Sequence, residues 1–128
     1  MSTLWTIGCI YGGASVVLGA FGAHGLKRRI ADPARLSNWN TAAQYQLMHS
    51  TALLITSLAP QCRASSIAGV FFTTGMTMFS GSLYLLTLDP QRFKFMGPVT
   101  PLGGMCMIGG WIALAFASRG RVRLPPSA

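Results

Sequence analysis

Four long apolar segments alternate with short polar connections along the chain. They cover residues 4–25, 39–59, 64–88 and 100–117. Each is close to the ~20 residues with which an α-helix crosses the ~30 Å hydrocarbon layer of a bilayer. Backbone groups in lipid must pair within their own segment, which favours helices over open strands. The pattern predicts an all-α fold, a four-helix transmembrane bundle that forms one domain over residues 1–128 and ends in a basic tail at 118–128.

Proline and aspartate punctuate the connections between these segments. The three connections contain Asp32-Pro33, Pro60 and Asp89-Pro90, respectively. Before the last segment, Thr100 is suited to be an N-cap and Pro101 fits the first helical position. The stretch 37–46 is amphipathic, so we expect the second helix to begin in the headgroup layer.

Small residues recur on one face of the first segment. Steps of three or four residues join Gly8, Gly12, Ser15, Gly19 and Gly22, which places all five on one side of a helix. Lipid provides no hydrophobic drive for helix association, and small residues let two backbones approach closely. We therefore expect the first helix to be a central packing element with a groove along this face.

Hydrogen-bonding side chains gather in one half of the predicted bundle. That half adjoins side A, defined as the side of the membrane that holds the first and third connections. The candidate binding residues are His24, Tyr45, Gln46, His49, Ser80 and Tyr84. Ionisable residues inside a membrane are costly and suggest a function by default.

Four interpretations of these side chains remain open. They could bond across helices and hold the bundle together, or they could line a pocket for a lipid headgroup, a quinone or a small solute. They could also move protons, or His24 and His49 could hold a haem. The glycine-rich face argues against a haem, because tight packing leaves little room for a porphyrin.

Composition supports a lipid environment. Charged residues make up 9% of the chain and hydrophobic residues 51%, whereas soluble domains have about 25% charged residues. The net charge of +8 comes from bases between the apolar segments, where they meet anionic phospholipids. This placement does not favour nucleic-acid binding. The bases at side A are Lys27, Arg28, Arg29, Arg35, Arg92 and Lys94. They outnumber the other four, so side A is expected to face the cytoplasm or matrix.

No catalytic set, metal site or cofactor motif is visible. The cysteines, Cys9, Cys62 and Cys106, are far apart and lack metal-ligand spacing. The two carboxylates, Asp32 and Asp89, both adjoin prolines in connections. We therefore expect a protein that is not an enzyme and has no cofactor. We also expect no cleavable signal, the first helix acting as its own insertion signal.

Several stretches carry a family resemblance across nearly the whole chain. They are LGAFGAHGL at 18–26, WNTAAQYQLMHSTAL at 39–53, FSGSLYLLTL at 79–88, GPVTPLGG at 97–104 and GGW at 109–111. In this order and spacing they resemble the domain of unknown function 423 family, which includes eukaryotic transmembrane protein 256. The resemblance implies a small four-helix protein of the bacterial inner membrane or the mitochondrial inner membrane. It implies no established enzymatic activity.

These observations lead to a functional expectation. The chain is expected to be a non-enzymatic multi-pass inner-membrane protein that serves as an accessory or assembly subunit of a larger membrane complex, a respiratory one if it is mitochondrial. Its expected partners are the bilayer, anionic phospholipids and other membrane protein subunits. The alternative is a module that binds or transports a lipid, quinone or small solute through the side A polar residues.

Overall fold

The structure is a computed structural model that describes residues 2–118. Its long helices are α1 (Thr3–His24), α2 (Pro33–Leu58), α3 (Arg63–Leu88) and α4 (Val99–Ser118). Two short 3-10 helices, η1 (Leu26–Arg28) and η2 (Lys94–Met96), lie in the first and third connections. The described residues contain no strand, so the predicted all-α fold with four helices is confirmed.

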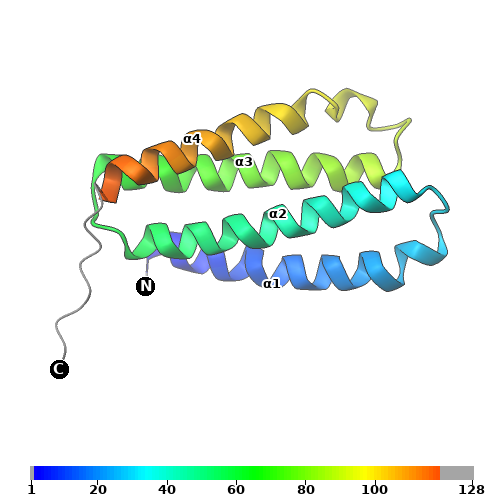
Figure 1. Ribbon diagram of the computed structural model, residues 1–128, viewed down its shortest axis with the longest axis horizontal. Coiled ribbons are helices and arrows are strands. Elements are labelled where there is room, and N and C mark those ends of the chain that lie inside the picture. The colour runs from blue at the N-terminus through cyan, green and yellow to red at the C-terminus, as the bar shows by residue number, and fades with distance from the viewer. Residues whose placement is uncertain (1, 119–128) are drawn as a thin grey trace.

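The helices form two antiparallel hairpins that meet through α2 and α3 (Figure 1). α1 packs on α2, and α4 packs on α3. The prediction that the first helix is central was therefore wrong, since α2 and α3 occupy the middle. α1 has small residues along one face only, so it can pack closely against one helix. α2 buries residues over a wider arc, because it must cover both α1 and α3.

The start of α2 differs from the predicted residue 39. Asp32 is the N-cap, with its Oδ1 atom accepting a hydrogen bond of 2.9 Å from the Ala34 N–H, and Pro33 is the first helical residue. An aspartate cap followed by proline is a helix-start signal, because proline has no N–H to leave unpaired in the first turn. The Asp32-Pro33 pair thus opens α2 rather than only interrupting the connection.

The start of α4 also differs from the prediction. The helix begins at Val99, so Thr100 lies inside its first turn and is not the N-cap. The Thr100 hydroxyl instead shares a 2.6 Å hydrogen bond with the Ser82 hydroxyl on α3. This bond ties the start of α4 to the last turns of α3.

Among residues 2–118, two buried apolar clusters hold the bundle. The larger lies between α2, α3 and α4 and contains Ala52, Leu53, Ala68, Phe72, Met76, Met107 and Leu114. The smaller lies beneath the first connection and contains Leu26, Ile30 and Trp39. It anchors the first connection to the side A end of α2.

Glycines bring the backbones of α3 and α4 into close contact. A Cβ atom on Gly75 would lie 2.8 Å from the Gly103 carbonyl oxygen, and one on Gly103 would lie 2.5 Å from the Phe79 nitrogen. Real side chains do not reach such distances, so this crossing requires glycine on both helices. Gly109 and Gly110 of α4 meet the rings of Phe71 and Phe72 instead.

Three stretches of the described residues are long and apolar enough to cross a membrane. They are Thr3–Arg28, Arg63–Leu88 and Lys94–Ala117. α2 is not among them, which corrects the prediction that its segment is an apolar span. α2 nevertheless connects the end of α1 to the start of α3, at opposite ends of the molecule (Figure 1). Its 26 residues rise about 39 Å at ~1.5 Å each, which is enough to cross.

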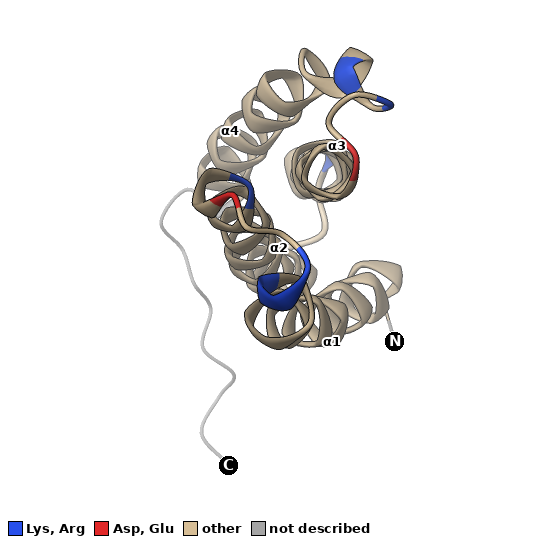
Figure 2. Ribbon diagram, turned by 90° about the vertical axis from the view of Figure 1, so that its right-hand side faces the viewer, with Lys and Arg blue, Asp and Glu red and all other residues tan. Residues whose placement is uncertain are grey.

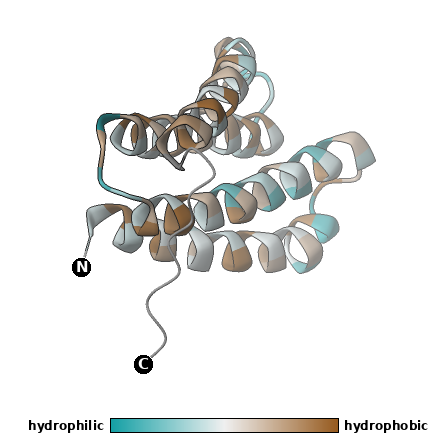
Figure 3. Cartoon of the chain, turned by 60° about the vertical axis from the view of Figure 1, so that its left-hand side comes forward, coloured by the Kyte–Doolittle hydropathy of each residue, from teal (hydrophilic) through white to brown (hydrophobic). Residues whose placement is uncertain are grey.

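Charge and hydropathy follow this arrangement. Figure 2 shows Lys and Arg in the connections at one end of the bundle and long uncharged stretches of helix behind them. Hydrophilic residues lie in the connections and also along α2 (Figure 3). Residues 119–128, nearly all of the predicted basic tail, lie outside the described residues. The described bases therefore mark the ends of the helices, as expected where a bundle meets lipid headgroups.

Candidate functional site

Gln46 is the centre of a hydrogen-bond network that joins three helices. It is 4% exposed in the middle of α2. Its amide nitrogen donates to the Tyr11 carbonyl oxygen of α1 at 3.0 Å. Its amide oxygen accepts from the Tyr84 hydroxyl of α3 at 2.9 Å. One side chain thus ties both neighbours to α2.

Further hydrogen bonds between helices lie close to this network. The Ser80 hydroxyl of α3 donates to the Ala42 carbonyl oxygen of α2 at 2.8 Å. The Tyr11 and Thr77 hydroxyls share a bond of 2.6 Å between α1 and α3. Predicted residues Gln46, Ser80 and Tyr84 therefore do come together at the α2–α3 interface.

His49 lies in an aromatic cluster between α2, α3 and α4. Its Nδ1 atom is 2.8 Å from the Tyr45 carbonyl oxygen, and its Nε2 atom accepts from the Trp111 indole N–H at 3.3 Å. A carbonyl oxygen can only accept, so the proton is on Nδ1 and the ring is neutral. The Tyr45 ring stacks on the imidazole with centroids 5.8 Å apart. Both ring nitrogens are thereby engaged within the bundle.

His24 lies apart from the other predicted site residues. It is the last residue of α1, is exposed, and places Nδ1 3.1 Å from the Ala20 carbonyl oxygen of its own helix. His49 is buried and fully engaged elsewhere. The two imidazoles do not form a common site, which contradicts the haem interpretation.

The small face of α1 lies against α2. Cβ atoms built on Gly8, Gly12, Gly19 and Gly22 would point at Leu54, Ser50, Ala43 and Trp39, respectively. Ser15, the other member of this face, is buried and donates from its hydroxyl to the Gly12 carbonyl oxygen at 2.6 Å. The five residues therefore form the contact surface of one helix pair.

Buried polar atoms are fully paired within the described residues. No buried side-chain nitrogen or oxygen in this part of the chain lacks a hydrogen-bond partner. The same residues contain no group of three or more His, Cys, Asp or Glu side chains placed to hold a metal ion. Cys9, Cys62 and Cys106 are unpaired thiols. Chemically, the arrangement of Gln46, Tyr84, Ser80 and His49 is suited to joining helices.

Sequence reasoning missed the role of Arg35. Its position beside the first connection predicts only a flanking charge, but its guanidinium donates to the Thr87 carbonyl oxygen at 3.0 Å and to the Leu88 carbonyl oxygen at 3.2 Å. The Thr87 hydroxyl returns a bond of 3.2 Å to the Arg35 carbonyl oxygen. The last carbonyls of a helix have no partner within it and attract cations. An arginine in the first turn of the preceding antiparallel helix was the available signal.

Two tryptophans were also missed. Trp39 is 3% exposed and donates its indole N–H to the Leu18 carbonyl oxygen of α1 at 2.8 Å. Its ring lies 4.5 Å from the Tyr84 ring, centroid to centroid. The indole N–H of Trp111 on α4 donates a hydrogen bond to the Nε2 atom of His49. A buried indole needs a partner for its one N–H, which was a hint in the sequence for Trp39 but not for the exposed Trp111.

Comparison with known proteins places these features in a family. The profile of the family described as "Protein of unknown function (DUF423)" matches residues 18–104. A UPF0382 membrane protein of Schizosaccharomyces pombe is 40% identical over 115 residues, which cover 88% of this chain and 98% of the relative. The UPF0382 membrane protein YwdK of Bacillus subtilis is 36% identical over 123 residues, covering 92% and 97%. No solved structure matches.

The family assignment agrees with the fold. The matched region includes the end of α1, all of α2 and α3 and the start of α4, and therefore contains Trp39, Gln46, His49, Tyr84 and Gly103. The relatives are named as membrane proteins in both a fungus and bacteria. The chain is an integral membrane protein that belongs to the DUF423 family.

Proposed function

We propose that this protein is a non-enzymatic accessory or assembly subunit of a larger membrane complex. The observation that carries the proposal is the complete pairing of buried polar side-chain atoms in the described residues. Gln46, Ser80, Tyr84 and His49 use their hydrogen-bonding capacity on neighbouring helices. A catalytic or transport site keeps some polar groups available for its substrate.

The outer surfaces of α1 and α4 support this role. α4 exposes Met105, Ile108, Ile112 and Phe116 along one face. α1 exposes Ile10 and Val17 on either side of Gly13, above which a Cβ atom would meet nothing within 4 Å. Small residues on an apolar face permit close approach of another membrane helix. The two outer helices thus offer surfaces to partner subunits.

The proposed setting is a bacterial inner membrane or the mitochondrial inner membrane. In the mitochondrial inner membrane the partner would be a respiratory assembly. Relatives from a fungus and from bacteria are compatible with both membranes. The net charge of +8 suits a membrane rich in anionic phospholipid.

The test is affinity purification of the tagged full-length chain from its own membrane in a mild detergent, followed by native gel electrophoresis and mass spectrometry. We expect it to co-migrate with other membrane subunits. Gly13→Leu adds bulk to the outer face of α1 and should release the partner without changing thermal unfolding of the purified chain. Gly81→Leu, at another glycine with nothing within 4 Å, is the matched control. Recovery only as a lone chain would contradict the proposal.

The alternative function, binding of a lipid, quinone or small solute, gains no support from the predicted residue set. Gln46, His49, Ser80 and Tyr84 face one another or other helices, and His24 is separate from them. A groove does exist at a different place in the bundle, between α1 and α2.

A further inference from the structure

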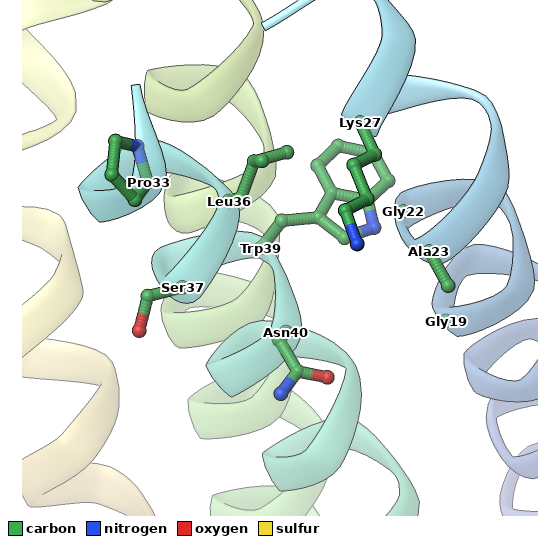
Figure 4. Close-up of a pocket in the computed structure, with 9 residues that line it drawn as sticks. All are labelled: Gly19, Gly22, Ala23, Lys27, Pro33, Leu36, Ser37, Trp39 and Asn40. Atoms are coloured by element: carbon green, nitrogen blue, oxygen red, sulfur yellow. The ribbon is translucent and has the colours of Figure 1, made fainter. Parts of the chain in front are cut away.

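A groove of about 500 Å³ opens between the last turns of α1 and the first turns of α2. Figure 4 shows its lining residues, with the Trp39 indole reaching from α2 toward α1. The groove lies beside the first connection, at the side A end of the bundle. Ligand pockets in proteins have about 300–1,000 Å³, so its size suits the headgroup of a lipid.

The groove is built into the helix pair. On the α1 side the groove is lined by Gly19, Gly22 and Ala23; the Trp39 ring covers Gly22, and the small residues Gly19 and Ala23 leave the space beside it open. The Trp39 ring is fixed by its bond to the Leu18 carbonyl oxygen and by packing against Tyr84. A ligand would therefore meet a preformed shape, which lowers the cost of binding.

The polar groups that line the groove are all capable of donating hydrogen bonds. They belong to Lys27, Ser37 and Asn40, and in Figure 4 the Ser37 hydroxyl points away from the Lys27 ammonium. All three residues are exposed. No acidic residue lines the groove, and Asp32 close by in sequence is occupied by the Ala34 N–H. One positive charge with a neutral amide donor beside it favours an anion that has several acceptor oxygens, such as a phosphate group.

The surroundings of the groove select a lipid over a soluble anion. Val16 of α1 lies three residues before Gly19, and Leu47 of α2 lies seven after Asn40, so both continue the helical faces that line the groove. Both side chains are exposed. A headgroup at Lys27 would thus be followed by an apolar track toward the bilayer centre, as an acyl chain requires.

We propose that this groove binds an anionic phospholipid, with the lipid phosphate at Lys27 and Asn40 and an acyl chain along Val16 and Leu47. The site differs from the polar network around Gln46 and does not depend on the accessory role. A variant can lose the lipid and keep its protein partners.

The experiment is native mass spectrometry of the full-length chain in detergent, titrated separately with phosphatidylglycerol, phosphatidylcholine and inorganic phosphate. We expect phosphatidylglycerol to bind in preference to the other two. Lys27→Gln should weaken this binding about fivefold, the contribution of one basic residue near a lipid surface. Arg29→Gln removes the same charge from the same connection outside the groove lining and should leave binding unchanged.

A second pair of variants tests the shape of the groove. Gly19→Leu should fill it and abolish binding, and its backbone has room because the nearest atom to a Cβ is Ala43 Cβ at 3.9 Å. Gly13→Leu is the control elsewhere on α1. Equal losses in Lys27→Gln and Arg29→Gln would overturn the proposal in favour of diffuse charge attraction. If phosphatidylcholine bound as tightly as phosphatidylglycerol, the groove would not select an anionic headgroup and the proposal would be wrong. If inorganic phosphate bound as tightly, the groove would be a site for a soluble anion and not for a lipid.

Discussion

The indole of Trp39 lies directly against the backbone of Gly22. A Cβ atom on Gly22 would be 2.4 Å from Trp39 Cδ1 and 2.6 Å from Trp39 Nε1. The same ring packs on Tyr84 and donates to the Leu18 carbonyl oxygen. This contact fixes the spacing of α1 and α2 at side A.

The space beside Gly22 is too small for a methyl group. Gly22→Ala should destabilise the chain by about 1–3 kcal/mol, because the added methyl must displace the Trp39 ring. The measurement is unfolding in detergent followed by circular dichroism. Gly13→Ala is the matched control on the same helix, since nothing lies within 4 Å of its Cβ position. Equal effects of the two substitutions would show that the ring moves freely.

Two adjacent glycines at the crossing of α3 and α4 should respond very differently to the same substitution. Gly103→Ala should cost about 3 kcal/mol or more, because its methyl group would meet the Phe79 and Gly75 backbones, which cannot rotate away. Gly104→Ala should be tolerated, since the nearest atoms are in the Phe79 ring at 3.8 Å. The free energy of unfolding of each variant tests this, and a tolerated Gly103→Ala would contradict the backbone contact.

The network around Gln46 predicts a difference between two tyrosines. Tyr84→Phe should destabilise by about 0.6–1.7 kcal/mol, as is typical of hydrogen bonds between membrane helices, because it leaves the Gln46 amide oxygen without its donor. Tyr45→Phe should be close to neutral, since Tyr45 takes part through its ring and its backbone carbonyl. A double-mutant cycle of Tyr84→Phe with Gln46→Leu measures the coupling, and a value near zero would mean that this bond does not stabilise the bundle.

The thiol of Cys62 yields a prediction about pH. Hydrogen bonds from the backbone and hydroxyl of Ser65 lower the pKa of Cys62, and it is exposed at the start of α3. A lowered pKa means that the thiolate persists to lower pH. Alkylation by a water-soluble maleimide, measured with Cys9→Ser and Cys106→Ser in place, should therefore reach half its maximal rate below the pH typical of a free cysteine. Ser65→Ala removes the hydroxyl and keeps the backbone N–H, so it should move this midpoint upward in part, and an unchanged midpoint would show that the Ser65 hydroxyl does not stabilise the thiolate.

Hydrophobic pattern and punctuation were sufficient to predict most of the helices. The observed bounds of α1, α3 and α4 lie within a residue of the predicted ranges. The start of α2 was missed because its first turns are polar and a search for apolar runs passes over them. The aspartate cap and Pro33 were better guides than hydropathy at this point.

Only some contacts of the candidate site could be predicted from the sequence. The helical spacing predicted that Gln46, Ser80 and Tyr84 lie in the same half of the bundle. In the structure the Tyr84 hydroxyl donates a hydrogen bond directly to the Gln46 amide oxygen. Spacing within one helix could not reveal that Trp111 would reach His49 or that Arg35 would cap α3. Those contacts depend on how far each helix is rotated against its neighbour. Packing between helices determines that rotation.

The polar character of α2 has a consequence for how the chain enters its membrane. α2 is not among the stretches that are apolar enough to cross a membrane by composition, and its Gln46 amide and the Nε2 atom of His49 find their partners on the other three helices, at Tyr11, Tyr84 and Trp111. A lone α2 would carry those groups into hydrocarbon unpaired, at a cost of several kcal/mol. We therefore expect α2 to enter the bilayer together with its neighbouring helices and not as an independent span.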